Sequence, residues 1–137
     1  MAHFILNDAE VVVNAVDLSD HVSSVRLNYS AELQDNSSMG DDTRKRLAGI
    51  KEWSIEVEFK QDFAAAEVDA TLFTLVGAAF FTVTVMPDKS LGVSATNPKY
   101  SGSAVLESYP PLDGAFGDLA KTSVVFQSAG VLSRLTA

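Results

Sequence analysis

Residues 51–61 read KEWSIEVEFKQ, where apolar and polar side chains alternate more regularly than anywhere else in the chain. One side of this segment is apolar and consists of Trp53, Ile55, Val57 and Phe59. The other side is polar and consists of Glu52, Ser54, Glu56, Glu58 and Lys60. A period of two residues indicates a β-strand with one buried face and one face open to solvent or to a partner.

Strand-like patterns recur on both sides of this segment. They predict strands over residues 10–16, 22–29, 80–86, 99–109 and 119–128, and a short one over 131–136. Turn-forming residues separate the first two, which we therefore expect to pair as a hairpin. An apolar repeat of three to four residues predicts one helix over 64–76, capped by Asp62 and ended by Gly77, with Val68, Leu72 and Leu75 packed on the sheet. The predicted fold is mainly β, an antiparallel β-sandwich or barrel with one flanking α-helix, in a single domain over residues 1–137.

Composition narrows the class of protein. The chain has 137 residues, 47% of them hydrophobic and 20% charged, with a net charge of −8 and no cysteine. These values are typical of a globular domain, and they exclude disulfides and thiolate metal sites. We expect no secretory signal and no membrane insertion, hence synthesis in the cytoplasm. The charge has the wrong sign for a protein that must hold phosphates.

The segment Leu33–Gly49, LQDNSSMGDDTRKRLAG, is polar and predicts a long loop between strands, at about residues 31–50. Its charges are balanced, because it holds three acidic and three basic residues: Asp35, Asp41, Asp42, Arg44, Lys45 and Arg46. A loop of mixed sign suits protein–protein contact better than phosphate binding. A mobile surface loop and a nucleic-acid contact remain as alternatives.

Residues that could carry catalysis or hold a metal are few. His3 and His21 are the only histidines, and a turn accounts for Asp17 and Asp20 beside His21. No nucleophile elbow or phosphate-binding glycine loop occurs. We therefore predict no catalytic, cofactor-binding or metal site and no enzyme, unless Asp17, Asp20 and His21 converge with carboxylates from elsewhere.

Acidic residues concentrate in the first part of the chain. Residues 1–62 hold 12 acidic and 6 basic residues, a net charge of −6, and the remainder holds 6 and 4. The polar side of segment 51–61 contributes Glu52, Glu56 and Glu58. It can be a solvated sheet face on which Arg26 lies opposite Glu56 or Glu58, or a surface that must lie near DNA without binding it.

Three runs resemble the tail tube (major tail) proteins of long-tailed bacteriophages and of related gene-transfer-agent particles. They are AVDLSDHVSSVRLNYSAE, MGDDTRKRLAGIKEWSIEVEFKQDF and TNPKYSGSAVLESYPPLDGAFGDLAKTSVVFQSAG, and the similarity extends from about Val13 to the C-terminus. The resemblance implies a structural virion protein that forms six-membered rings with a continuous inner β-barrel, stacked into a DNA-conducting tube. The resemblance also implies that the long loop is the contact between rings. The residues concerned are Asp35, Asp41, Asp42, Arg44, Lys45 and Arg46.

The same resemblance implies the surroundings of the protein. Arg26, Glu52, Glu56 and Glu58 are the candidates to face the lumen. The implied partners are further copies of the chain, a tape measure protein, a tail terminator and distal tail or baseplate proteins, with DNA as non-specifically conducted cargo in a virion tail. Two alternatives stay open: a distal tail or terminator protein of the same fold, and a small soluble module that binds carbohydrate or protein.

Overall fold

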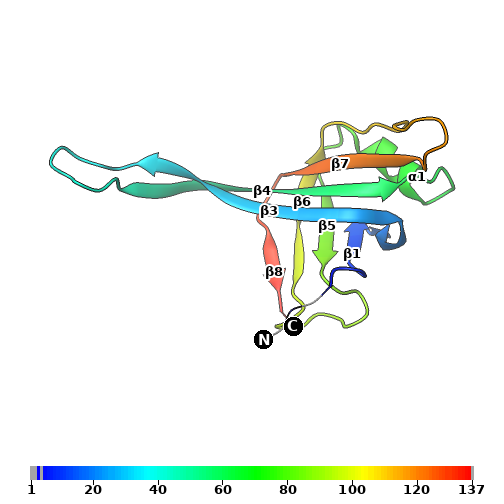
Figure 1. Cartoon of the computed structure of the whole chain (residues 1–137), viewed down its shortest axis with the longest axis horizontal. Helices are drawn as coiled ribbons and strands as arrows, with labels where there is room; N and C mark the ends of the chain where they lie inside the picture. Colours follow the sequence, from blue (N-terminus) through cyan, green and yellow to red (C-terminus); the bar gives the residue numbers. More distant parts are fainter. Residues whose placement is uncertain (1–2, 4, 137) are drawn as a thin grey trace.

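The computed structural model describes residue 3 and residues 5–136. Its elements, in chain order, are β1 (Glu10–Val13), β2 (Val16–Asp17), η1 (Ser19–His21), β3 (Val22–Asp35), β4 (Arg46–Lys60), α1 (Val68–Leu72), η2 (Phe73–Leu75), β5 (Phe81–Met86), β6 (Lys99–Leu106), β7 (Lys121–Ser128) and β8 (Ser133–Leu135). Figure 1 shows a body formed by all these elements and a long two-stranded projection that leaves it at one end.

The strands form one sheet in the order β2-β1-β5-β6-β7-β4-β3, and β8 pairs with β6. Every pairing between these strands is antiparallel. The prediction of a mainly β, antiparallel fold is therefore confirmed. No helix among the described residues is long and apolar enough to cross a membrane.

One hydrophobic core lies inside the curved sheet. Trp53, Ile55, Val57 and Phe59 are all buried in it, as the alternation of segment 51–61 predicted. The strands at the two ends of the sheet order pack on the same core, β2 through Val16 and β3 through Leu27. The sheet must therefore curl back on itself, because its first and last strands share one interior.

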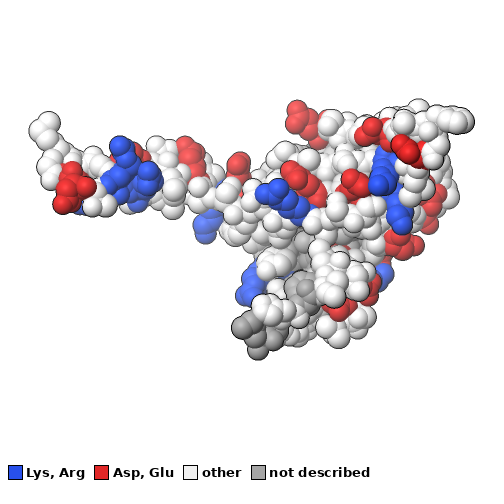
Figure 2. All heavy atoms as spheres, viewed as in Figure 1, with Lys and Arg blue, Asp and Glu red and all other residues white. Residues whose placement is uncertain are grey.

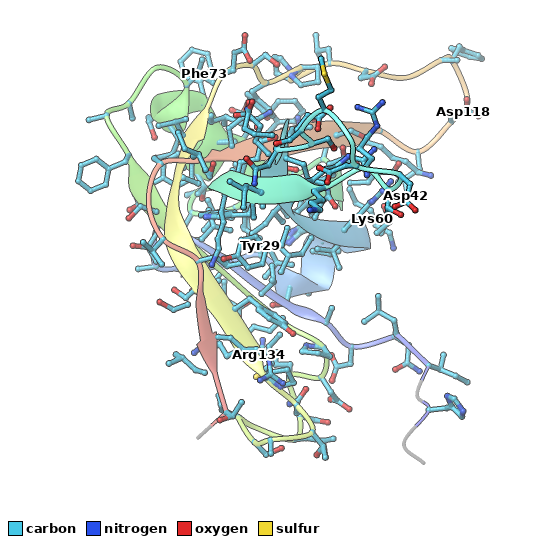
Figure 3. The ribbon with its side chains drawn as sticks, turned by 90° about the vertical axis from the view of Figure 1, so that its left-hand side faces the viewer. Tyr29, Asp42, Lys60, Phe73, Asp118 and Arg134 are labelled. Carbon is cyan, nitrogen blue, oxygen red and sulfur yellow. The ribbon has the colours of Figure 1, made fainter. Side chains whose placement is uncertain are left out.

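The helix is shorter than predicted. The segment 64–76 contains α1 over Val68–Leu72 and a 3-10 turn over Phe73–Leu75, and residues before Val68 are not helical. Ala66 has a left-handed φ of 62°, which breaks the helical path. The predicted packing is confirmed, since Val68, Leu72 and Leu75 are buried, whereas Phe73 projects outward (Figure 3).

The predicted hairpin between residues 10–16 and 22–29 is wrong. β1 pairs with β2 and β5, and β3 pairs with β4, so β1 and β3 lie far apart in the sheet order. Asn14 and Ala15 both have positive φ, at 50° and 67°. Two left-handed residues form a tight two-residue turn, which folds β2 back onto β1 before β3 begins.

The predicted long loop is also wrong in its bounds. β3 continues to Asp35 and β4 starts at Arg46, so only residues 36–45 lie outside the strands. We call residues 31–51 the arm. These strands could not be recognised from the sequence, because alternation appears only where one side of a strand is buried. The arm has no buried face, since every residue from 32 to 52 is exposed.

Candidate functional site

The arm is held together by its own polar contacts. Asp35 lies opposite Arg46 across the two strands and forms an ion pair with Arg44. Lys45 lies 3.2 Å from an Asp41 carboxylate oxygen, and the backbone N–H of Asn36 donates to the Lys45 carbonyl at 2.8 Å. The charges predicted to contact another ring thus first stabilise the tip of the arm itself. Figure 2 shows acidic and basic groups side by side along it.

Apolar side chains are exposed on both faces of the arm. Leu33 pairs with Ala48 and Leu47 pairs with Gln34, so the two leucines project from opposite faces. They are 60% and 58% exposed, and Ile50 is 81% exposed. A two-stranded ribbon without a core is marginally stable in water, and such exposed apolar groups mark contact surfaces. The arm is therefore suited to insertion between neighbouring surfaces.

Trp53 marks the point where the arm leaves the body. From Ser54 to Lys60, β4 pairs with both β3 and β7. Before Ser54, on the side of the arm, only β3 remains beside it. The Trp53 indole is buried and its Nε1–H donates to the Gly130 carbonyl at 2.9 Å. This anchor ties the base of the arm to the segment before β8.

The polar face of the body gathers the four residues predicted to face a lumen. Arg26 lies opposite Glu56 across β3 and β4, and Glu52 and Glu58 follow on the same face. β7 adds a cation that sequence reasoning missed: the Lys121 ammonium lies 3.6 Å from a Glu58 carboxylate oxygen. Lys60, directly opposite Lys121, belongs to this face as well.

This polar face is mixed in sign. Its charged residues are three acids and three bases, namely Glu52, Glu56, Glu58, Arg26, Lys60 and Lys121. The expectation of an acidic surface is corrected on this point, because β7 brings a lysine from a distant part of the sequence beside the glutamates. Figure 2 shows basic and acidic groups interspersed over the body.

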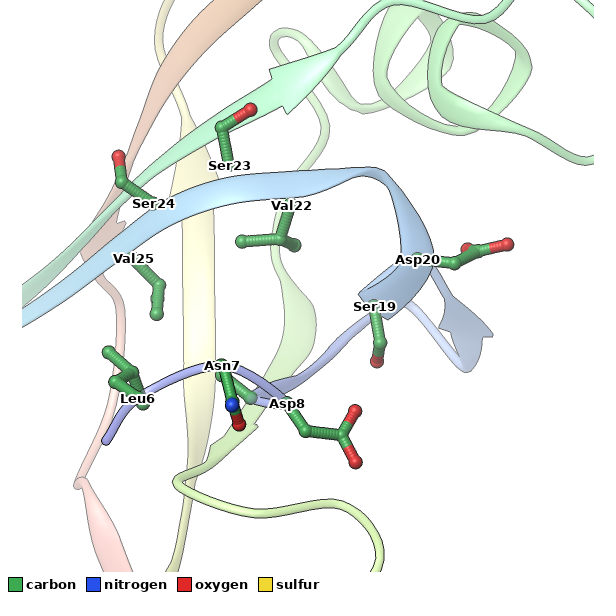
Figure 4. Close-up of a pocket in the computed structure, with 10 residues that line it drawn as sticks. Leu6, Asn7, Asp8, Ser19, Asp20, Val22, Ser23, Ser24 and Val25 are labelled. Atoms are coloured by element: carbon green, nitrogen blue, oxygen red, sulfur yellow. The ribbon is translucent and has the colours of Figure 1, made fainter. Parts of the chain in front are cut away.

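One free edge of the sheet lies along β3, which has a strand partner on one side only and is much longer than β2 at the other end of the sheet order. An open groove of about 310 Å³ runs beside its start, between Val22–Val25 and the N-terminal residues Leu6–Asp8 (Figure 4). A second, apolar hollow of about 150 Å³ continues it past Leu27 and Val85. Unpaired strand edges are templates for pairing with another chain.

His21 is the centre of a polar cluster that sequence reasoning missed. Its Nδ1 lies 3.0 Å from Asp20, and its Nε2 lies 3.0 Å from Asp62 and 3.2 Å from Glu67. Burial lowers the pKa of His21, but the hydrogen bond to Asp62 and the charges of Asp20 and Glu67 outweigh it and raise the pKa above its usual value. Asp17 belongs elsewhere, since it pairs with Lys89 at 2.5 Å.

An enzyme was left open only if Asp17, Asp20 and His21 converge with carboxylates from elsewhere, and the cluster meets this condition in part. Carboxylates from elsewhere, Asp62 and Glu67, do converge on the histidine, and Asp20 joins them. Among the described residues, however, no hydroxyl hydrogen-bonds to His21 that could serve as a nucleophile. The sequence signal for Asp62 was read only as a helix cap; its Oδ1 accepts the Ala64 N–H, and its Oδ2 faces the histidine.

Comparison with known proteins gives matches in structure only. No protein-family model matches the sequence, and no curated protein does. A chain of the virion of a native gene transfer agent (GTA) particle aligns with a TM-score of 0.71 at 20% identity, over 95% of this chain and 96% of that one. A chain from the tail of an empty GTA particle, with C6 symmetry, aligns with a TM-score of 0.66 at 23% identity, over 85% and 83%.

An extracellular contractile injection system provides a third match. A chain of the PVC sheath/tube terminator in the extended state aligns with a TM-score of 0.70 at 14% identity, over 98% of this chain and 97% of that one. Identities this low establish shared architecture and leave the role of the chain to be argued from its own surfaces. The chain therefore shares its fold with these chains of GTA particles and of the injection-system terminator.

Proposed function

We propose that this chain is a non-catalytic structural subunit that self-assembles into six-membered rings, stacked as the tube of a virion tail. The observation that carries the proposal is the arm, a ribbon with apolar groups on both faces that leaves one end of a body of tail-tube-type fold. A monomer gains nothing from such a ribbon, whereas a stack of copies buries it.

Lateral contacts within a ring use the free edge of β3. A strand of the next copy adds to this edge, and the groove beside Val22–Val25 leaves room for it. Closing the ring removes the exposed edge, which otherwise invites uncontrolled pairing. The apolar hollow past Leu27 supplies hydrophobic contact to the same neighbour.

Contacts between rings use the arm. Because the arm projects from one end of the body and α1 lies toward the other, successive copies associate head to tail (Figure 1). A head-to-tail contact does not close on itself and generates a filament of rings. Leu33 and Leu47, on opposite faces, insert between two subunits of the neighbouring ring.

The polar face of the body lines the lumen in this arrangement. Its charges balance, with Arg26 opposite Glu56 and Lys121 beside Glu58, so the face offers phosphates no excess of cations. Non-specific binding to nucleic acid needs such cations, so DNA passes as cargo without being held. The further partners are a tape measure protein within the tube, a terminator at one end and distal tail or baseplate proteins at the other.

The experiment is negative-stain electron microscopy of the concentrated protein. We expect long tubes from the unchanged chain, and isolated rings from the double variant Leu33→Ser and Leu47→Ser, because exposed side chains add little to the stability of the monomer. Leu91→Ser is the matched control, since Leu91 is 73% exposed but lies outside the arm and the β3 edge. Tubes of normal length from the double variant contradict the proposed role of the arm.

A second candidate is a terminator or distal tail protein, which occurs once per tail. The alignment with the PVC sheath/tube terminator favours it, because the TM-score of 0.70 is close to that of the GTA virion chain. Such a protein forms single rings at any concentration, whereas a tube protein elongates. A chain that stays monomeric in the same images supports a small binding module instead.

A further inference from the structure

A histidine and two carboxylates meet at the end of the body opposite the arm. His21 lies just before β3, Asp62 lies just after β4, and Glu67 precedes α1. The His21 Nε2 is 3.0 Å from the Asp62 Oδ2 and 3.2 Å from the Glu67 Oε2. All three atoms lie within 4.8 Å of one another.

The remaining polar atoms of His21 and Asp62 are already held by other partners. The His21 Nδ1 lies 3.0 Å from the Asp20 Oδ1, and the Asp62 Oδ1 accepts the Ala64 N–H at 2.9 Å. Histidines that bind metals usually donate the second ring N–H to a carboxylate, which fixes the tautomer and leaves the other nitrogen for the ion. Asp20 is placed to do this for His21.

We propose that His21, Asp62 and Glu67 bind a divalent ion of the zinc class. One imidazole nitrogen with two carboxylate oxygens suits Zn²⁺ or Co²⁺ better than Ca²⁺ or Mg²⁺, which prefer oxygen alone. Tetrahedral ligands at about 2.0–2.1 Å from zinc lie roughly 3.3 Å from one another. The observed 3.0 and 3.2 Å are close to that spacing, and water completes the coordination.

Charge also favours an ion over a proton in this cluster. Asp20, Asp62 and Glu67 bring three carboxylates, and among the described residues neither Lys nor Arg forms a salt bridge with them. A protonated His21 offsets one of these charges, whereas a divalent ion with neutral imidazole offsets two. The ion and the proton therefore compete for Nε2, and the ion leaves less unbalanced charge.

The position of the cluster gives the ion a structural role. His21 and Asp62 flank the β3–β4 hairpin, so an ion between them ties its two ends together where the hairpin joins the body. An ion that binds the folded chain stabilises it by mass action. This role is independent of ring or tube formation.

The test uses the untagged full-length chain after treatment with a chelator. Isothermal titration with Zn²⁺ and visible spectra with Co²⁺ should show one ion per chain, and Zn²⁺ should raise the Tm. His21→Asn, Asp62→Asn and Glu67→Gln should each abolish the Zn²⁺-dependent rise in Tm and the Co²⁺ spectrum. Asp20→Asn should weaken binding by about 10–100-fold, the usual effect of removing a partner of a liganding histidine.

His3→Asn is the matched control, because His3 is the other histidine and is exposed outside the cluster. It should bind Zn²⁺ as the unchanged chain does. Far-UV circular dichroism identifies any variant that fails to fold, and the three ligand substitutions provide independent readings. The absence of saturable Zn²⁺ binding by the intact chain, or undiminished binding by folded His21→Asn or Glu67→Gln, overturns the proposal.

Discussion

Gly102→Ala should loosen the joint between arm and body. A Cβ at Gly102 would lie 2.5 Å from the Trp53 Cζ2 and 3.1 Å from its Cη2. Ordinary carbon contacts begin at about 3.5 Å, so the buried indole must move by roughly 1 Å. That movement strains the hydrogen bond from the Trp53 Nε1 to the Gly130 carbonyl.

The magnitude follows from two opposing effects. Overpacking a well-filled core costs about 1–3 kcal/mol, and weakening the buried hydrogen bond adds to this cost. Replacing glycine gains about 0.4–1 kcal/mol through the unfolded chain where the backbone tolerates alanine. We expect a net loss of about 1–3 kcal/mol in the free energy of unfolding at Gly102, and a fall in Tm of roughly 4–12 °C for a chain of this size.

The assay is urea denaturation followed by the fluorescence of Trp53, the only tryptophan in the chain. Gly114→Ala is the control, because a Cβ there meets nothing within 4 Å. In a Trp53→Phe background, read by circular dichroism, the cost of Gly102→Ala should fall, since the smaller ring leaves room. Equal urea midpoints for Gly102→Ala and Gly114→Ala, or an unchanged cost beside phenylalanine, refute the reasoning.

Three further predictions concern the body. Leu72→Ala should cost about 2–5 kcal/mol in urea denaturation because Leu72 is fully buried, whereas Phe73→Ala, one residue on and exposed, should change stability by less than about 0.5 kcal/mol. Burial and then the neighbouring carboxylate of α1 raise the pKa of Tyr109 to about 12, so an ultraviolet titration should show one late-ionising tyrosine that Tyr109→Phe removes. Despite partial burial, the Lys89 and Ser19 contacts hold the pKa of Asp17 below its usual value. Lys89→Met should therefore lower the urea midpoint slightly at pH 7, and the difference should vanish as the pH falls through the lowered pKa of Asp17.

Predictions from periodicity succeeded where burial is one-sided. The buried side of β4, from Trp53 to Phe59, and that of β7 were evident because local alternation records which side meets the core. The helix was overextended because the apolar spacing continues before Val68, although Ala66 has a left-handed backbone. Periodicity carries no information on such a turn.

The pairing of the strands was harder to predict from the sequence than the strands themselves. Residues 10–16 and 22–29 are neighbours in sequence, yet β1 pairs with β5 and β3 with β4. The tight turn at Asn14 and Ala15 was the local signal that could have shown the separation, since it closes a hairpin before β3 starts. The full register depends on contacts between distant segments, which no local pattern specifies.

The sequence by itself determined the β class, the buried side of β4 and the mixed charge of residues 33–49. Alternation shows residue by residue which side of a strand is buried, and the charge of a segment is a count of its residues. Only the tertiary structure decided that those residues form a paired arm, that Lys121 lies beside Glu58, and that Asp62 and Glu67 meet His21. The physical reason is that each of these contacts depends on which strands pair and in which register, and local alternation does not record that. Charges that are distant in the chain become neighbours only when those strands pair.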